Sequence, residues 1–214
     1  MYLEKINGPA DIKKLNIDEL NVLADETRHY LIEKVSNHGG HVGPNLGMVE
    51  ATVALHYVFN SPVDKIVFDV SHQSYAHKIL TGRKEAFMDP AHYNDVSGYS
   101  EPTESGHDHF VIGHTSTSIS LACGLAKGRD LTGGKENVIA VIGDGSLSGG
   151  EALEGLDVAG SELNSNFIII VNDNQMSIAE NHGGLYKNLQ LLRETNGKAE
   201  VNLFKAMGLE YLYV

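Results

Sequence analysis

The sequence contains little of several residue types that mark particular classes of protein. A single cysteine among 214 residues excludes an internal disulfide framework. Lys and Arg number 16 against 28 Asp and Glu, so the net charge of −12 argues against a nucleic-acid-binding protein, which would present a basic surface. The longest apolar runs, such as residues 167–171, are far shorter than the roughly 20 residues that cross a bilayer, and the first residues form no apolar signal segment. We therefore expect a soluble cytoplasmic protein.

What the sequence does contain is an alternation of helix and strand patterns. Apolar residues at helical spacing predict helices at residues 18–35, 46–59, 115–131, 150–160 and 201–207. Continuous apolar runs predict buried strands at residues 65–70, 137–142 and 167–171, with a further strand beginning at 209–214. Residues 89–110 carry little periodicity and are expected to form a long loop. This order predicts an α/β fold with a doubly wound, mostly parallel sheet and helices on both faces.

Two polar clusters follow predicted strands and are the strongest indication of a site. Residues 143–146 (Gly-Asp-Gly-Ser) follow one strand, and residues 172–174 (Asn-Asp-Asn) follow the next, one crossover later. Open α/β sheets bind ligands at the carboxyl ends of their strands, and a helix that begins there favours phosphate. An Asp carboxylate with an Asn amide oxygen suits Mg²⁺ or Ca²⁺ held jointly with diphosphate oxygens. Either cluster alone could be an ordinary turn, so the prediction depends on the pair.

Other phosphate-binding motifs are missing from the sequence. Neither G-x-x-x-x-G-K-[ST] nor G-x-G-x-x-G occurs, which excludes a P-loop and a dinucleotide fingerprint. A haloacid-dehalogenase-like phosphatase also uses a Gly-Asp-Gly loop, but it would need an early Asp-x-Asp nucleophile that this chain does not contain.

Longer motifs make the comparison with a known family possible. They are residues 36–41 (Ser-Asn-His-Gly-Gly-His), 69–83 (Asp-Val-Ser-His-Gln-Ser-Tyr-Ala-His-Lys-Ile-Leu-Thr-Gly-Arg), 113–120 (Gly-His-Thr-Ser-Thr-Ser-Ile-Ser) and 172–177 (Asn-Asp-Asn-Gln-Met-Ser). With the Gly-Asp-Gly loop, these segments resemble the 1-deoxy-D-xylulose-5-phosphate synthase family of the transketolase superfamily. The resemblance implies a thiamine-diphosphate-binding fold, with residues 1–214 as its diphosphate- and Mg²⁺-binding module. The pyrimidine-binding module and the C-terminal domain of the family are absent from this chain.

The resemblance also implies roles for individual residues. The expected Mg²⁺ ligands are Asp144, the Asn174 side chain and the Met176 carbonyl. The expected contacts to thiamine diphosphate are His72, Gly113, His114, Thr115, Gly145, Ser146 and Asn174. His41 and His72 are the expected catalytic residues, which would transfer protons or orient the substrate near neutral pH. The cofactor would act as the electron sink in the transfer of a two-carbon unit from a keto acid such as pyruvate to an aldose phosphate.

Departures from the family pattern concern the substrate and the length of the chain. After His41 the sequence reads Val-Gly-Pro-Asn-Leu-Gly, where the family has a segment of the type Leu-Ala-Ser-Gly-Leu-Gly. Only residues 180–200 stand where the synthases have a long insertion. The chain ends inside an apolar strand pattern, so we expect a longer polypeptide or a partner subunit to supply the rest of the cofactor site. The family implies a homodimer.

Two alternatives remain open at this point. The chain could be the N-terminal section or subunit of a transketolase with a ketose phosphate donor. It could also be a non-catalytic module that binds phosphate or mediates dimerisation.

Five further histidines and the cysteine are expected to be ordinary surface, capping or packing residues. These histidines are His38, His56, His77, His92 and His182. The pair His107 and His109 has no third soft ligand nearby in the sequence, which argues against a zinc site. Cys123 lies within a predicted helix between small residues and is expected to be buried and unreactive.

Overall fold

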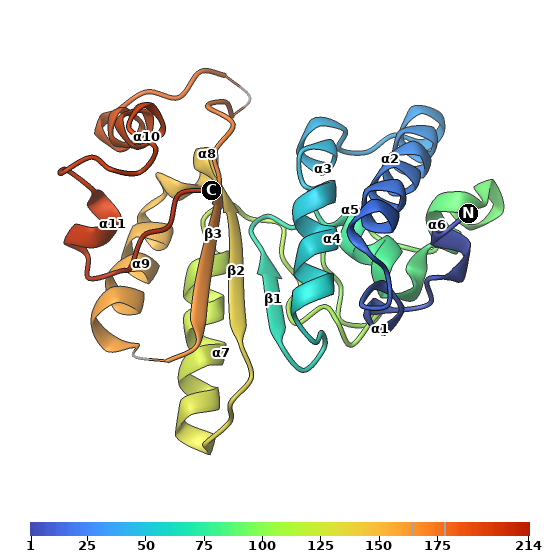
Figure 1. Cartoon of the computed structure of the whole chain (residues 1–214), viewed down its shortest axis with the longest axis horizontal. Coiled ribbons are helices and arrows are strands. Elements are labelled where there is room, and N and C mark those ends of the chain that lie inside the picture. Colours follow the sequence, from blue (N-terminus) through green and yellow to red (C-terminus); the bar gives the residue numbers. More distant parts are fainter. Residues whose placement is uncertain (164, 178) are drawn as a thin grey trace. The chain divides into compact units, whose positions relative to one another are not determined.

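The computed structural model describes residues 1–163, 165–177 and 179–214, and the chain divides into two compact units. Unit 1 comprises Met1–Gly113 and unit 2 comprises His114–Val214 (Figure 1). Among the described residues, no helix combines the length and the apolar character that a membrane crossing requires.

Unit 1 is mainly helical. Its elements are η1 (Leu3–Lys5), α1 (Pro9–Ile12), α2 (Ile17–His38), α3 (Gly43–Leu46), α4 (Val49–Val58), β1 (Lys65–Phe68), α5 (Tyr75–Lys78), η2 (Ile79–Arg83), α6 (Glu85–Met88) and η3 (Pro90–His92). The expected long loop at residues 89–110 is confirmed apart from the short η3. The expected helix at residues 46–59 is divided, because Pro44 begins the separate turn of helix α3 before α4 begins at Val49.

The long helix α2 is defined at both ends by local signals in the sequence. Its first turn is a capping box: Asn16 Oδ1 accepts a hydrogen bond from the Glu19 amide at 3.0 Å, and Glu19 Oε2 accepts one from the Asn16 amide at 2.8 Å. Gly39, with a φ of 87°, ends the helix. The buried face of α2 carries Leu23 and Leu31 into the core of unit 1.

Strand β1 ends earlier than the sequence predicts. The expected strand at residues 65–70 stops at Phe68, because Val70 and Ser71 have positive φ angles of 57° and 67°. A β-branched residue in this region is a backbone outlier, so the turn between β1 and His72 is strained. Ser71 is buried; its hydroxyl donates a hydrogen bond to the Ile112 carbonyl at 3.1 Å and accepts one from the Ser100 amide at 2.7 Å.

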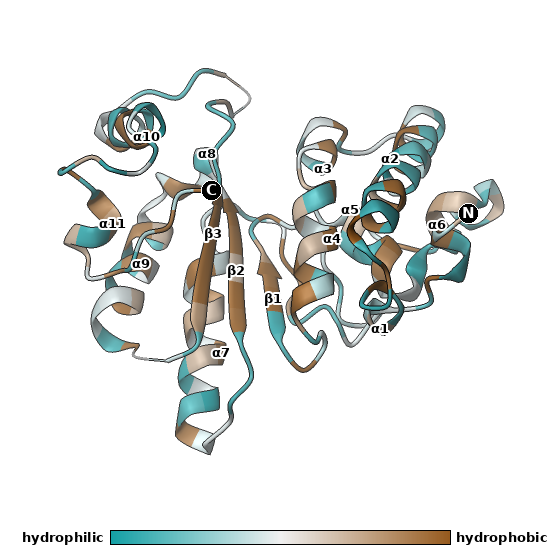
Figure 2. Cartoon of the chain, viewed as in Figure 1, coloured by the Kyte–Doolittle hydropathy of each residue, from teal (hydrophilic) through white to brown (hydrophobic). Residues whose placement is uncertain are grey.

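Unit 2 contains the parallel strand pair that the sequence predicts. Its elements are α7 (Ser118–Thr132), β2 (Val138–Gly143), α8 (Asp144–Leu147), α9 (Gly150–Glu162), β3 (Phe167–Asn172), α10 (Gly184–Glu194) and α11 (Leu203–Ala206). Strands β2 and β3 are parallel and apolar along most of their length (Figure 2); helix α7 packs against both strands, and α9 packs against α7. The register pairs Val138 with Phe167 and Gly143 with Asn172, so both strands end at the same level. The α/β expectation is confirmed.

Two expectations for unit 2 are corrected by the structure. Helix α7 begins at Ser118 rather than at residue 115, because Ser116 lies in the left-handed region with a φ of 73°. Residues 209–214 form no strand. In that segment the Tyr211 ring stacks on Phe204, with centroids 5.5 Å apart and planes at 9°, so side-chain packing rather than strand pairing orders it.

Candidate functional site

Asp144 and Asp173 directly follow the paired ends of β2 and β3. Because Gly143 pairs with Asn172, the residue after each strand emerges at the same edge of the strand pair. This places the Gly-Asp-Gly loop beside the Asn-Asp-Asn segment, as the spacing of the two clusters predicts.

Asp144 is a buried carboxylate held by hydrogen bonds from a side chain and from main-chain amides. Its Oδ2 atom accepts a hydrogen bond from Asn181 Nδ2 at 2.7 Å. Burial, followed by the negative charge of Asp173, raises the pKa of the Asp144 carboxyl above its ordinary value, although the Gly145 and Asn174 amides donate hydrogen bonds that oppose the rise. A cation at this position would relieve the repulsion between the two carboxylates.

The segment after β3 turns so that its side-chain oxygens face its own main chain. Asp173 Oδ1 accepts a hydrogen bond from the Gln175 amide at 3.1 Å, and Asn174 Oδ1 accepts one from the Met176 amide at 3.1 Å. Gln175 has a φ of 67°, a conformation that non-glycine residues adopt mainly in tight turns. The other carboxylate oxygen of Asp173 forms an ion pair with Arg193 on α10.

A cavity of about 660 Å³ lies at this end of unit 2. The three residues expected to hold Mg²⁺ all line it, and they are joined by residues of the segment 180–194. The lining residues are Asp144, Asp173, Asn174, Gln175, Met176, Glu180, Asn181, His182, Gly183, Tyr186, Lys187, Gln190 and Arg193. The structure therefore brings the expected metal ligands together in one cavity. Among the residues that the structure describes, no three His, Cys, Asp or Glu side chains form a metal-binding group, so a metal here would depend on amide and main-chain oxygens.

Gly145 and Ser146 contact neighbouring loop residues. A Cβ atom at Gly145 would lie 2.8 Å from Ser177 Cβ, so the missing side chain is what lets residue 177 approach. The Ser146 carbonyl accepts a hydrogen bond from Ser116 Oγ at 2.7 Å. The Tyr186 hydroxyl on α10 donates to Ser148 Oγ at 2.8 Å. Helix α10 is thus attached to the Gly-Asp-Gly loop on one side and to Asp173 on the other.

His114 and Thr115 precede helix α7 in unit 2 and are exposed. The Nδ1 atom of His114 lies 2.8 Å from the Thr115 carbonyl oxygen, and Thr117 Oγ1 donates to the His114 carbonyl at 3.2 Å. Gly113 is the last residue of unit 1, and a Cβ atom there would have no neighbour within 4 Å.

In unit 1 the two expected catalytic histidines lie next to each other. The ring centroids of His41 and His72 are 5.3 Å apart, with planes at 80°. The Nδ1 atom of His41 lies 3.3 Å from the Tyr75 hydroxyl, and the Tyr99 ring lies 5.6 Å from the His41 ring. Burial, followed by the proximity of His41, lowers the pKa of His72, while the charge of Asp69 opposes this. At neutral pH these effects favour a neutral His72 imidazole that can accept a proton.

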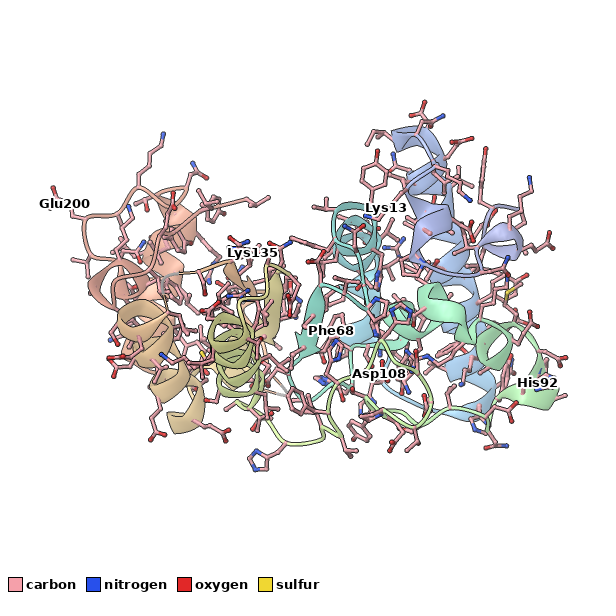
Figure 3. The ribbon with its side chains drawn as sticks, turned by 90° about the horizontal axis from the view of Figure 1, so that it is seen from below. Lys13, Phe68, His92, Asp108, Lys135 and Glu200 are labelled. Carbon is pink, nitrogen blue, oxygen red and sulfur yellow. The ribbon has the colours of Figure 1, made fainter. Side chains whose placement is uncertain are left out.

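A second cluster of unit 1 is buried and structural. His77 Nε2 lies 3.0 Å from Asp108 Oδ1, and His77 Nδ1 lies 2.9 Å from His56 Nε2. Arg83 donates to both oxygens of Asp108, at 2.7 and 2.9 Å. Through Asp108, which is labelled in Figure 3, these bonds attach the long loop at residues 89–110 to α5 and η2 of unit 1. The packing role expected for His56 and His77 is consistent with their burial.

The other two histidines of this region, His107 and His109, are only half-buried. His107 Nδ1 lies 2.8 Å from Ser61 Oγ, and His109 Nε2 is buried without a hydrogen-bond partner. Burial lowers the pKa of each imidazole to about 4.

Several residues near the site were not identified from the sequence. They are Asn45, Tyr75 and Tyr99 in unit 1, and Asn181, Tyr186 and Arg193 in unit 2. The helical spacing of the buried Leu189 and Leu192 is a signal that could have revealed α10. For Asn45 no signal exists in the sequence, because its partners are main-chain atoms of distant residues.

Comparison with known proteins identifies the family. A family model described as 1-deoxy-D-xylulose-5-phosphate synthase matches residues 3–212. The chain belongs to the 1-deoxy-D-xylulose-5-phosphate synthase family. It is 55% identical over 191 residues to the synthase of Caldanaerobacter subterraneus subsp. tengcongensis, a match that covers 89% of this chain and 30% of that protein. It is 52% identical over 194 residues to the synthase of Dictyoglomus thermophilum, covering 91% of this chain and 31% of that protein.

Solved structures support the fold of this synthase-family chain. Transketolase from Campylobacter jejuni superposes with a TM-score of 0.69 at 21% identity, covering 91% of this chain and 33% of the transketolase. Transketolase from Leishmania mexicana gives a TM-score of 0.63 at 18% identity, covering 88% and 31%. The α/β fold is therefore that of the transketolases, and the chain spans about a third of the length of the proteins it matches.

Proposed function

We propose that the chain is the diphosphate- and magnesium-binding part of a thiamine-diphosphate-dependent synthase. The reaction is the decarboxylation of pyruvate and the transfer of the two-carbon unit to an aldose phosphate. The observation that carries this proposal is the arrangement of Asp144 and Asn174, which line one cavity at the paired ends of β2 and β3. Membership of the synthase family supports the choice of reaction.

The residues of the cavity suit the proposed cofactor. A buried carboxylate, an amide oxygen and a main-chain carbonyl are hard oxygen ligands, so Asp144, Asn174 and Met176 would hold Mg²⁺. Lys187 also lines this cavity, whereas Arg193 is paired with Asp173, so Mg²⁺ would supply most of the positive charge that a diphosphate anion needs. When bound, thiamine diphosphate supplies the electron sink for carbon–carbon bond chemistry.

Other residues of the chain would position the cofactor and move protons. The turn at Gly145 and Ser146 would contact the diphosphate, and Gly113, His114 and Thr115 would contact the cofactor before helix α7. His41 and His72 would accept and return protons at the substrate, since a neutral imidazole beside a second one can act as a base near pH 7.

The cofactor and its metal can be tested by calorimetry. In the complete enzyme, thiamine diphosphate should bind only with Mg²⁺, and Asp144→Asn should weaken Mg²⁺-dependent binding by at least about 10-fold. Asp157→Asn is the matched control, because Asp157 is exposed on α9, away from the cavity lining. Binding that is independent of Mg²⁺, or equal in the two variants, would contradict the assignment. Under those results a non-catalytic phosphate-binding module becomes the better description.

The donor substrate decides between the two enzyme classes. Release of carbon dioxide from pyruvate is the result expected of a synthase. Cleavage of a ketose phosphate without decarboxylation would instead indicate a transketolase.

The proposal extends to assembly and location. Because the chain spans about 30% of the matched synthases, we infer that a pyrimidine-binding module is supplied by further chain or by a partner subunit. Residues 1–214 alone should then show no turnover and only weak cofactor binding, and robust activity of this fragment would refute that inference. We infer that the complete enzyme is a homodimer, which light scattering would test. We also infer a cytoplasmic location, which cell fractionation would test.

A further inference from the structure

Asn45 lies at the centre of the contacts between the two histidines of unit 1. Its Nδ2 atom donates a hydrogen bond to the His41 carbonyl at 2.8 Å and a second one to the His72 carbonyl at 2.7 Å. Its Oδ1 atom accepts a hydrogen bond from the Tyr75 amide at 2.9 Å. The side chain is completely buried, and both donor hydrogens and its acceptor oxygen are used.

The three groups bound by Asn45 all belong to one cluster. Tyr75 is the residue whose hydroxyl lies 3.3 Å from His41 Nδ1 and 3.4 Å from the His41 amide nitrogen. The Asn45 side chain therefore holds the main chain of His41, His72 and Tyr75, and the Tyr75 hydroxyl in turn contacts the His41 imidazole. A buried amide whose donors and acceptor are paired in this way holds the main chain of its partners in one arrangement.

The segment that carries His72 needs such a restraint. His72 follows Val70 and Ser71, which both have positive φ angles, and strained backbone persists only where surrounding contacts over-determine it. The hydroxyl of Ser71 holds the turn from one side through Ile112. Asn45 holds it from the other through the His72 carbonyl.

We propose that Asn45 is a positioning residue, which fixes His41 and His72 at the spacing that proton transfer to the substrate requires. This inference rests on the proposed function of the two histidines. It adds to that function the residue that sets the geometry of the two histidines. Asn45 acts through main-chain atoms and is not itself a catalytic residue.

The variants are chosen to separate positioning from general stability. Asn45→Ala removes all three hydrogen bonds. Asn45→Asp keeps the size of the side chain and the acceptor for the Tyr75 amide, but it loses both donors and places a carboxylate against two carbonyl oxygens. Thr52→Val is the matched control, because Thr52 is also completely buried and donates to a main-chain carbonyl, that of Met48 at 2.6 Å, on helix α4.

The first readout is the kinetics of the complete, cofactor-loaded enzyme. Asn45→Ala and Asn45→Asp should each lower kcat by about 100-fold, the loss typical of a misplaced catalytic group, with little change in KM for the donor. Thr52→Val should keep the wild-type kcat even if it lowers the thermal unfolding midpoint as much as the Asn45 variants do. If the asparagine variants keep kcat within about threefold of wild type, or if Thr52→Val loses as much, the proposal is overturned.

The second readout does not depend on activity. Nitrogen-15 NMR of the histidine rings follows the titration of His41 and His72. Because His41 lowers the pKa of His72, separation of the two rings in the Asn45 variants should move the His72 titration to higher pH, whereas Thr52→Val should leave it in place. An unchanged titration in the Asn45 variants would overturn the proposal. If the wild-type enzyme has no activity while the titration shifts as expected, the proposed function fails and the positioning role of Asn45 stands.

Discussion

Acidification is expected to destabilise unit 1 through its buried and half-buried histidines. His107 and His109 have pKa values lowered by burial from 6.5 to about 4. In the unfolded chain both imidazoles regain their ordinary pKa, so between pH 6.5 and 4 the unfolded state binds protons that the folded state does not. The contribution of these two neutral imidazoles to the free energy of unfolding is therefore complete above pH 6.5 and is lost as the pH falls towards 4.

The magnitude follows from the size of the shift. A difference of about 2.5 units would correspond to about 3.4 kcal/mol for a fully buried group; because each imidazole is only half-buried, solvent screening reduces the loss to about 1–2 kcal/mol for each. His56 and His77, whose pKa values burial also lowers, act in the same direction. Two such losses amount to roughly 3 kcal/mol, which is a substantial part of the stability of a small domain, about 5–15 kcal/mol.

The charged neighbours of this cluster set the limits of the pH window. Arg83 and Lys78 face the imidazoles and oppose their protonation. Although burial alone would raise the pKa of Asp108, hydrogen bonds from His77 and Arg83 hold it well below its usual range, so this carboxylate stays charged throughout the window. His92 lies exposed at the edge of unit 1 (Figure 3), and Asp95 raises its pKa, so it acts in the opposite direction.

The assay is urea unfolding followed by circular dichroism at pH 7, 6, 5 and 4.5, with hydrogen exchange of peptides from residues 75–110 to locate the change. The slope of unfolding free energy against pH should flatten in His107→Gln, which cannot take up the proton. His29→Gln, an exposed position, serves as the control. Equal unfolding free energies at pH 7 and 4.5, or the same slope in His107→Gln and wild type, would refute the reasoning.

Two further predictions concern unit 2. Gly145→Ala should weaken Mg²⁺-dependent cofactor binding by about 10-fold or more, because the new Cβ would lie 2.8 Å from Ser177 Cβ and displace that loop. A Cβ at Gly143 would have no atom within 4 Å, so Gly143→Ala should bind the cofactor as the wild type does in calorimetry. Equal affinities of the two variants would contradict this account. Burial raises the pKa of the Cys123 thiol to about 11, so at pH 8 the folded protein should react with Ellman's reagent at least about 100-fold more slowly than the urea-unfolded protein. Complete reaction of the folded protein within the mixing time would show that the thiol is accessible.

Much of the fold could be predicted because it is specified by local signals. Strands β2 and β3 are continuous apolar runs, and helix α2 carries its capping box and its terminal glycine in the sequence itself. Residues 209–214 show the limit of this reasoning. An apolar run predicts that a segment will be buried, but it does not indicate whether a neighbouring strand or an aromatic ring such as Phe204 will cover it.

The candidate site was predictable where function is carried by side chains in a motif. Asp144 and Asn174 could be paired from their positions after two strands, because parallel strands bring their carboxyl ends together. Asn45 could not be predicted, because it acts on carbonyl and amide groups that every residue has, and only the folded backbone shows which of these it binds. The left-handed conformation of Val70 was equally hidden, since nothing local favours it.

The register of β2 and β3 has a consequence for how this chain can change over evolutionary time. The level at which Asp144 and Asp173 emerge is set by main-chain pairing along the two strands, from Val138 opposite Phe167 to Gly143 opposite Asn172. Exchange of one apolar strand residue for another of similar volume leaves that level untouched and costs little stability. Deletion of one residue inside either strand would move one cluster along the ladder by about 3.3 Å and turn its side chains to the opposite face. Length within these strands is therefore under stricter constraint than composition, and variation in chain length has to be accommodated in the loops.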